Sequence, residues 1–397
     1  MREASGRSET GSDWVVEPPA VVEIGIKEAG RITFLDNLRA FVILLVVVMH
    51  GAMCYMLYAP EWWYVVDEQQ SLFFTVLVLA VDVPIMLIMF FISGYFALRS
   101  LVKRGPNGFL KDKFIRIGAP WLFGVLFLAP LTAYMLYIRW DVPVGYLQFW
   151  SNDFWGEMFQ QSVYWFLGIL FLLFFVLALA YDISPRLRRA RPRLEWPSWR
   201  LFLGFWALMS LGMFIMSAFF PIDSWHSQSK LFVFQPLRLP LYFGYFALGI
   251  YAYLRGWFRE GGYRPRTAVW GPIWLIAGLL YLGNRLFVLP SEMADIGKVA
   301  HAPLFNAFCL SSLLFASAVF QRWFNSPSSF WSSLSANSYG IYYIHPLVLY
   351  PAAYLFLGVP LPLAVKAPLV IAIGLAGSWL VSEFFLRRAP LVRRAFG

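Results

Sequence analysis

The chain has 397 residues, of which 60% are hydrophobic, 19% are aromatic and only 14% are charged. A typical soluble domain is roughly 25% charged, so this composition excludes a water-soluble globular enzyme, and the abundant aromatic residues exclude a disordered protein. Two cysteines cannot form a disulfide framework. The net charge of +10 comes from basic residues between apolar runs, which indicates membrane topology rather than nucleic-acid binding.

Ten apolar runs are long enough to cross a bilayer, whose hydrocarbon core of ~30 Å requires about 20 apolar residues in a helix. The sequence therefore predicts an all-α polytopic membrane protein with about ten transmembrane helices over residues 31–388. A polar tail at 1–30 and a short basic tail at 389–397 are predicted to flank it. The runs lie at residues 36–58, 72–98, 114–138, 162–182, 200–220, 236–255, 268–289, 301–321, 337–357 and 363–386.

Basic residues are divided unequally between the two sets of alternating loops. Most of the 32 lysines and arginines fall near the two termini and in the loops that follow spans 2, 4, 6 and 8. Because such residues stay in the cytoplasm, both termini are predicted to be cytoplasmic, and the more acidic loops are predicted to face outward. The first 30 residues contain no apolar segment, so no cleaved signal peptide is expected.

Among the ionisable residues of the predicted spans, four are singled out: Arg39 and His50 in the first, Asp82 in the second and His345 in the ninth. Such residues are functional candidates, because a charged or polar side chain is costly in lipid. Arg39 and His50 are eleven residues apart, which in an α-helix is three turns plus about 20° and a rise of ~16 Å. Both are therefore predicted to leave one helix face, and Asp36 is close enough to pair with Arg39 or to cap the helix.

This arrangement of Arg39 and His50 suits a long ligand with an anionic head and a reactive tail. Coenzyme A thioesters have that shape, and their pantetheine arm, on the order of 15–20 Å long, matches the rise between the two residues. A neutral imidazole can take a proton from an acceptor hydroxyl or attack the thioester itself. Each residue alone has a simpler explanation: a hydrogen-bonded core histidine, and an arginine that anchors the span at the interface.

Five segments, in order, resemble one family. RITFLDNLRAFVILLVVVMH (31–50) contains an Arg-x10-His motif formed by Arg39 and His50, and MFFISGYFALRS (89–100) contains Ser93 and Gly94. KDKFIRIGAP (111–120), YWFL (164–167) and SYGIYYIHPLVLY (338–350) follow. Together they resemble the acyltransferase 3 family of ten-span integral membrane acyltransferases over about residues 31–386, with Lys113 where many members have arginine.

The resemblance implies transfer of an acyl group from cytoplasmic acyl-CoA to a hydroxyl of an envelope carbohydrate or lipid-linked glycan, in the cytoplasmic membrane of a bacterium. It implies that His50 is the catalytic residue and Arg39 its necessary companion. Acyl-CoA is then the donor substrate, and no metal or prosthetic group is expected. The chain looks closest to the branch that succinylates periplasmic glucans, so the acyl group is expected to be acetyl or succinyl.

Further residues are candidates for contacts with the donor. Lys113 and Arg116 lie in a basic cluster at the cytoplasmic side, where topology alone explains most positive charge. Arg116 also stands at the apolar boundary and at the family position, so it is expected to contact the donor phosphates. Ser93 and Gly94 interrupt the second span, where glycine either permits close helix packing or makes room for the thioester arm.

Two candidates lie nearer the acceptor side. Asp82 precedes Pro84, so it is expected either to cap a broken helix or to bind an acceptor hydroxyl. His345 precedes Pro346, which removes a backbone donor and kinks a helix. This histidine is therefore either structural or a second polar group in the cavity of His50. Aromatic residues of the outer loops suit a membrane-interface belt or sugar stacking, namely Trp62, Trp63, Tyr64, Trp150, Trp155 and Trp225.

Two other classes of protein fit part of this pattern. In a transporter of an anionic metabolite or lipid-linked glycan, the same ionisable residues would line the pathway, but the sequence lacks the repeated halves that transporters often have. The intact Arg39–His50 pair disfavours an inactive scaffold. The predicted partners are therefore acyl-CoA, a glycan acceptor and the lipid bilayer, without nucleic acid, and His50 is either a general base or a transient acyl carrier.

Overall fold

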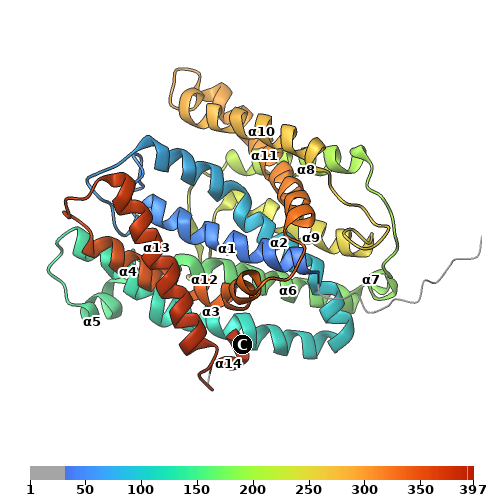
Figure 1. Cartoon of the computed structure of the whole chain (residues 1–397), viewed down its shortest axis with the longest axis horizontal. Coiled ribbons are helices and arrows are strands. Elements are labelled where there is room, and N and C mark those ends of the chain that lie inside the picture. Colours follow the sequence, from blue (N-terminus) through green and yellow to red (C-terminus); the bar gives the residue numbers. More distant parts are fainter. Residues whose placement is uncertain (1–31, 391) are drawn as a thin grey trace, which may run out of the picture. The chain divides into compact units, whose positions relative to one another are not determined.

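Each of the ten predicted apolar runs coincides for most of its length with helices of the computed structural model, which describes residues 32–390 and 392–397 (Figure 1). The predicted tail at 1–30 lies outside the described residues. The all-α class predicted from the sequence is confirmed. The long helices are α1 (Thr33–Met53), α2 (Leu72–Lys113), α6 (Trp165–Ile183), α8 (Trp199–Ser217), α9 (Leu239–Leu254), α10 (Thr267–Gly283), α11 (Ala294–Trp323), α12 (Ser329–Leu355) and α13 (Leu363–Val381).

The third predicted span is not one regular α-helix. It consists of η1 (Phe114–Gly118), α3 (Ala119–Phe123), η2 (Gly124–Leu128) and α4 (Ala129–Arg139), of which η1 and η2 are π-helical. Proline has no N–H to bond the carbonyl four residues before it. The carbonyl of Arg116, four residues before Pro120, accepts a hydrogen bond from the Tyr339 hydroxyl (2.8 Å) instead. Two further π-helical turns follow α10 and α13, namely η6 (Asn284–Val288) and η7 (Ser382–Leu386).

Within the described residues, seven helical segments are long and apolar enough to cross a membrane, by length and composition alone. One of them, Leu72–Arg139, contains two of the predicted spans. The spans predicted at 236–255 and 337–357 are not among these seven segments. They correspond to α9, which has 16 residues, and to α12, whose first half is rich in serine. A polytopic membrane protein is confirmed, whereas the number ten and the cytoplasmic position of both termini stay predictions.

The helix that carries Arg39 and His50 is surrounded by others, because α1 packs against α2, α11, α12 and α13 (Figure 1). The α2 and α9 helices meet through glycine. A Cβ atom on Gly94 would collide with the carbonyl oxygen of Phe246, and one on Gly249 would collide with that of Phe91. Small residues allow such backbone contact in membrane helices, so Gly94 packs two helices together, the simpler of the two roles considered for it.

Part of the loop between α1 and α2 is buried. Trp63, Tyr64 and Asp67 are each 3% exposed, and the Asp67 carboxylate pairs with Lys366 of α13 at 3.0 Å, with the lysine side chain 1% exposed. The second oxygen of Asp67 also accepts a hydrogen bond from the backbone N–H of Gln69 (2.8 Å). A buried ion pair offsets its desolvation only with such additional bonds, so this pair fixes the loop against α13.

Short elements lie in the other connections. An antiparallel hairpin precedes α9, with His226 of its first strand opposite Phe234 of its second. After the last long helix, Phe396 of α14 (Arg393–Phe396) stacks on Tyr339, with ring centroids 4.8 Å apart, so the predicted basic tail contacts the bundle. The remaining short elements are α5 (Tyr146–Gln148), η3 (Phe149–Asp153), η4 (Ser162–Tyr164), α7 (Pro185–Arg189), β1 (His226–Gln228), β2 (Phe232–Phe234) and η5 (Pro236–Arg238).

Candidate active site

Two polar contacts join α1 to α12, one at each end of the same helix face. Arg39 Nη2 donates to Ser335 Oγ at 3.4 Å, and His50 Nδ1 lies 2.8 Å from His345 Nε2. Ser335 and His345 follow each other along α12 in the same order, and at almost the same spacing, as Arg39 and His50 along α1. The helices therefore run parallel, and both side chains point toward α12, as helical periodicity predicts.

The imidazole rings of His50 and His345 lie edge to edge in one plane. Their centroids are 5.1 Å apart and their planes differ by 11°. This separation equals the 2.8 Å distance between the nitrogen atoms plus the radii of the two rings, so both nitrogens lie on the line between the centroids. The contact is therefore a linear hydrogen bond along an in-plane lone pair and not a face-to-face stack.

The backbone of α12 decides which nitrogen of each neutral ring carries the proton. Pro346 has no N–H, so the carbonyl of Tyr342, four residues before it, has no partner from the helix. His345 Nδ1 lies 2.7 Å from this oxygen. A carbonyl only accepts, so His345 Nδ1 is the N–H donor and its Nε2 is the acceptor. His50 must then donate from Nδ1, and its own Nε2 is left as the basic nitrogen.

The buried part of the α1–α2 loop covers one side of this pair. The Trp63 ring packs on His50, with centroids 5.5 Å apart and planes 28° apart, and also meets Tyr350 edge-on at 5.5 Å. Arg139 donates to the backbone oxygen of Trp63 (2.8 Å). Burial raises the pKa of the Tyr64 hydroxyl to about 12, so it stays protonated and donates to Gln160 (2.6 Å). His345 is fully buried, whereas His50 keeps partial exposure.

The Arg39 end of the same face is also polar. Arg39 lies 3.7 Å from Asp36, with side chains 38% and 17% exposed, so the predicted pairing is present. Asp36 stands within the first turn of α1, which begins at Thr33, and not at its cap position. A carboxylate in the first turn still favours the helix, because that end of the backbone dipole is positive.

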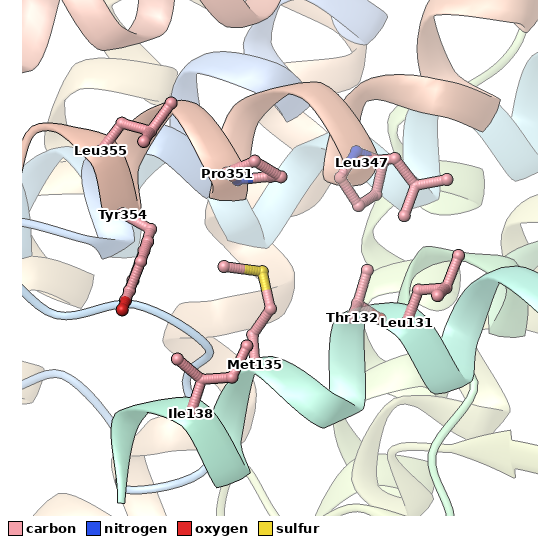
Figure 2. Close-up of a pocket in the computed structure, with 9 residues that line it drawn as sticks. Leu131, Thr132, Met135, Ile138, Leu347, Pro351, Tyr354 and Leu355 are labelled. Atoms are coloured by element: carbon pink, nitrogen blue, oxygen red, sulfur yellow. The ribbon is translucent and has the colours of Figure 1, made fainter. Parts of the chain in front are cut away.

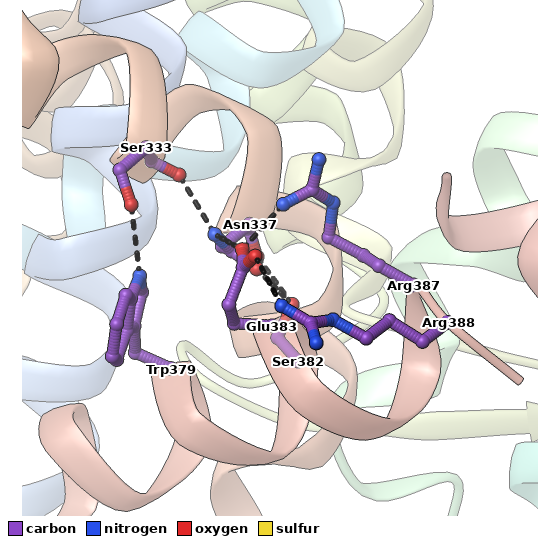
Figure 3. Close-up of polar contacts among 7 residues, drawn as sticks. All are labelled: Ser333, Asn337, Trp379, Ser382, Glu383, Arg387 and Arg388. Carbon is purple, nitrogen blue, oxygen red and sulfur yellow. Dashed lines mark hydrogen bonds and ion pairs between the residues drawn. The ribbon is translucent and has the colours of Figure 1, made fainter.

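A second polar group lies nearby in α12 and η7. Asn337 Nδ2 donates to Glu383 (2.8 Å), and its side-chain oxygen accepts from Ser382 Oγ (2.8 Å). Glu383 also pairs with Arg387 and lies 3.7 Å from Arg388. Figure 3 shows these side chains converging on the Glu383 carboxylate, which thereby holds two cations at the end of the bundle where Arg39 lies.

The predicted donor contacts Lys113 and Arg116 flank Asp112. Arg116 Nε is 3.2 Å from the carboxylate, and its side chain is 50% exposed. Lys113 is 19% exposed, lies 4.0 Å from Asp112, and its Nζ sits over the rings of Phe109 and Phe174. Arg116 therefore retains an open face for an anion, while Lys113 is held between α2 and α6.

Comparison with known proteins now decides the family. A family model described as an acyltransferase domain, that of acyltransferase 3, matches residues 32–383. The chain belongs to the acyltransferase 3 family. No curated protein and no solved structure matches it. In general terms this acyltransferase 3 protein is a membrane acyltransferase with several transmembrane helices.

In this acyltransferase 3 protein, Asp82 does not cap a broken helix. The α2 helix continues through Asp82 and Pro84, and its only non-helical backbone angles are at Gly105. Asp82 instead forms a close ion pair with Arg238, whose side chain is 10% exposed. The expectation of a helix break was wrong because a proline removes one hydrogen bond without ending a helix that neighbouring helices support.

An apolar pocket of about 510 Å³ lies between α4 and α12 of the acyltransferase (Figure 2). It begins at Pro346, directly after His345, and continues toward Leu355. Apart from Thr132 and Tyr354 its lining is hydrocarbon and thioether, so it suits an apolar chain. His50 and His345 do not line it.

Several neighbours of the histidine pair could not be identified from the sequence. Ser335 is one of many serines in α12, and Lys366 carries no sign that it is buried. In the sequence, Trp63 is one of many aromatic residues in the predicted outer loops. The segment SYGIYYIHP (338–346) is the local signal that marks His345 in the sequence. Among the described hydrogen bonds, none joins Ser93 to the histidine pair.

Proposed function

We propose that this protein transfers an acyl group, acetyl or succinyl, from cytoplasmic acyl-CoA to a hydroxyl of an envelope carbohydrate or lipid-linked glycan. The membrane is then the cytoplasmic membrane of a bacterium. The observation that carries the proposal is the hydrogen bond between His50 and His345, which leaves a basic nitrogen on a partly exposed imidazole. Family membership supports the acyl transfer in general terms.

His50 acts as a general base in the simpler of two routes. Its Nε2 takes the proton of the acceptor hydroxyl while the oxygen attacks the thioester carbonyl. The carbon–sulfur bond then breaks, and the thiolate of coenzyme A receives the same proton from the imidazolium. Throughout, His50 Nδ1–H remains bonded to His345 Nε2, so His345 holds the ring orientation and disperses the positive charge.

In the second route His50 carries the acyl group. Nε2 attacks the thioester, the carbon–sulfur bond breaks, and an acyl-imidazolium forms while coenzyme A leaves as a thiolate that takes a proton from the medium. The acceptor oxygen then attacks the acyl carbon, the carbon–nitrogen bond breaks, and the hydroxyl proton returns to the medium. Such an intermediate requires exclusion of water, and the packing of Trp63 on one face of His50 supports that requirement.

The length of α1 supports a donor that extends from Arg39 to His50. Arg39 and His50 are separated by a rise of ~16 Å along the helix, with both side chains on the α12 face. Arg39 and the exposed Arg116 supply positive charge for the phosphates of the donor at one end. The thioester then reaches the histidine pair at the other end.

Release of thiol from acetyl-CoA and succinyl-CoA by the purified protein tests this proposal, with and without envelope glycans. We expect His50→Ala to abolish release, and Arg39→Ala to raise the KM for the donor about tenfold with a smaller effect on kcat. His226→Ala, a histidine in the β1 strand, is the matched control and should retain the wild-type rate. Release limited to one equivalent without acceptor would favour the acyl-imidazole route.

Absence of release with either thioester, from protein shown to be folded, would contradict the proposal. Specific binding of an anionic metabolite by the same protein would then favour a transporter.

A further inference from the structure

A row of tryptophans leads away from His50. Trp63, which packs on His50, contacts Trp62 with ring centroids 5.9 Å apart, and Trp62 contacts Trp225 at 6.4 Å. Trp225 contacts Trp165 at 5.4 Å. The row combines the α1–α2 loop, the connection between α8 and β1, and the first residue of α6. Trp62 and Trp225 are 42% and 38% exposed, so their rings are accessible to a ligand.

The far end of the row meets a charged cluster. The Trp165 ring is 5.5 Å from that of Tyr242, which lies one helical turn after Arg238 in α9. Arg238 pairs with Asp82 of α2 and lies 3.6 Å from Asp223. Asp223 stands two residues before Trp225, so the same connection contributes to both the aromatic row and the cluster.

The charges of this cluster cancel. Arg285 pairs with Asp223 at 2.5 Å, so two arginines face two aspartates. The arginine side chains are 10% and 18% exposed, whereas those of Asp82 and Asp223 are 34% and 46% exposed. The buried arginines therefore fix the aspartates, and the aspartates present oxygen atoms outward. Asp223 also adopts a positive φ of 63°, which is uncommon outside glycine and is held here by its two ion pairs.

An incompletely bonded buried histidine lies beside the cluster. His301 is 3% exposed, and its Nδ1 has no hydrogen-bond partner within the described part of the chain. It lies within electrostatic range of Arg285, Asp223 and Arg238. A buried nitrogen without a partner costs free energy, so this site retains hydrogen-bonding capacity that a ligand or a water can use.

We propose that the tryptophan row and the cluster of Asp82, Arg238, Asp223 and Arg285 bind a neutral saccharide, which is the acyl acceptor. Aromatic faces pack on the C–H faces of sugar rings, and partly exposed carboxylates accept hydrogen bonds from sugar hydroxyls. Because the cluster has no net charge, it gives an anionic ligand no advantage. The row ends at His50, so a sugar bound along it is directed toward the reacting nitrogen. The role of the bound saccharide as the acyl acceptor rests on the proposed acyl transfer, whereas saccharide binding itself does not.

Binding of the detergent-solubilised full chain to an array of neutral and uronic-acid oligosaccharides tests the inference. We expect wild-type protein to bind neutral glycans, and Trp225→Ala and Asp223→Asn each to weaken binding about tenfold or more, as for a residue that dominates an interface. Trp140→Ala is the matched control, because Trp140 is 46% exposed, adjoins Arg139 and lies outside the row. Its binding should equal that of the wild type.

The outcomes separate this inference from the proposed function. Failure to bind any neutral glycan, stronger binding of the uronic acids, or unchanged binding by Trp225→Ala would overturn the saccharide site. Thiol release that depends on His50 would leave the acyl transfer intact in that case. Conversely, Trp225-dependent glycan binding without thiol release would keep the saccharide site and remove its role as the acyl acceptor.

Discussion

Replacement of His345 tests the proton arrangement that the α12 backbone imposes. In His345→Leu, no acceptor faces His50 Nδ1, which in the wild type donates at 2.8 Å to Nε2 of the fully buried His345 ring. The free energy of the His50 tautomer with the proton on Nδ1 is then raised by the cost of one buried unsatisfied donor, about 1–3 kcal/mol. Since 1.36 kcal/mol is tenfold in rate, kcat should fall about 5- to 150-fold.

The assay compares His345→Leu with His345→Gln in steady-state thiol release. The amide oxygen of glutamine can accept from His50 Nδ1, so His345→Gln should retain a rate within about fivefold of the wild type, the effect expected when the hydrogen bond is kept. The KM for acyl-CoA should change little in either variant. Equal losses in both variants, or a wild-type rate in His345→Leu, would refute the reasoning.

Two further predictions concern the scaffold. Lys366→Met leaves the Asp67 carboxylate buried without its partner and should lower the free energy of unfolding by about 3–5 kcal/mol. The double variant Lys366→Met, Asp67→Leu should recover most of this loss. Denaturation in detergent measures both variants, and equal losses would contradict the ion-pair account. Gly94→Ala and Gly249→Ala should prevent recovery of monodisperse protein, because their Cβ atoms would collide with backbone oxygens. Gly204→Ala is the control, because a Cβ atom there meets open space. A normal gel-filtration profile for Gly94→Ala would argue against this packing.

Helical periodicity predicted the relation between Arg39 and His50, because both belong to one helix and only its pitch matters. It could not predict that His345 is the partner of His50, since the two lie 295 residues apart and apolar patterns do not say which helices touch. The resemblance to the family marked both histidines without joining them. The hydrogen bond between them had to come from the structure.

The sequence was least informative where polar residues pair over long distances. Asp67 belongs to a loop whose acidic residues suggested an outward position, yet Lys366 of α13 holds it inside the protein. Asp82 looked like a helix-breaking residue beside Pro84, yet Arg238 of η5 pairs with it along an unbroken helix. In both cases tertiary contacts outweigh local preference, which is the reason that such residues cannot be placed by pattern alone.

The main-chain oxygen of Tyr342 occupies the place that a carboxylate holds in soluble hydrolases with a nucleophile, a histidine and an acid. A carboxylate at that depth would bring a formal charge into a medium of low polarity, at a cost of several kcal/mol. The oxygen released by Pro346 is electrically neutral and already fixed in direction. Pro346, which has no functional group, thus leaves a backbone oxygen free to orient His345, and no anion has to be buried for that purpose.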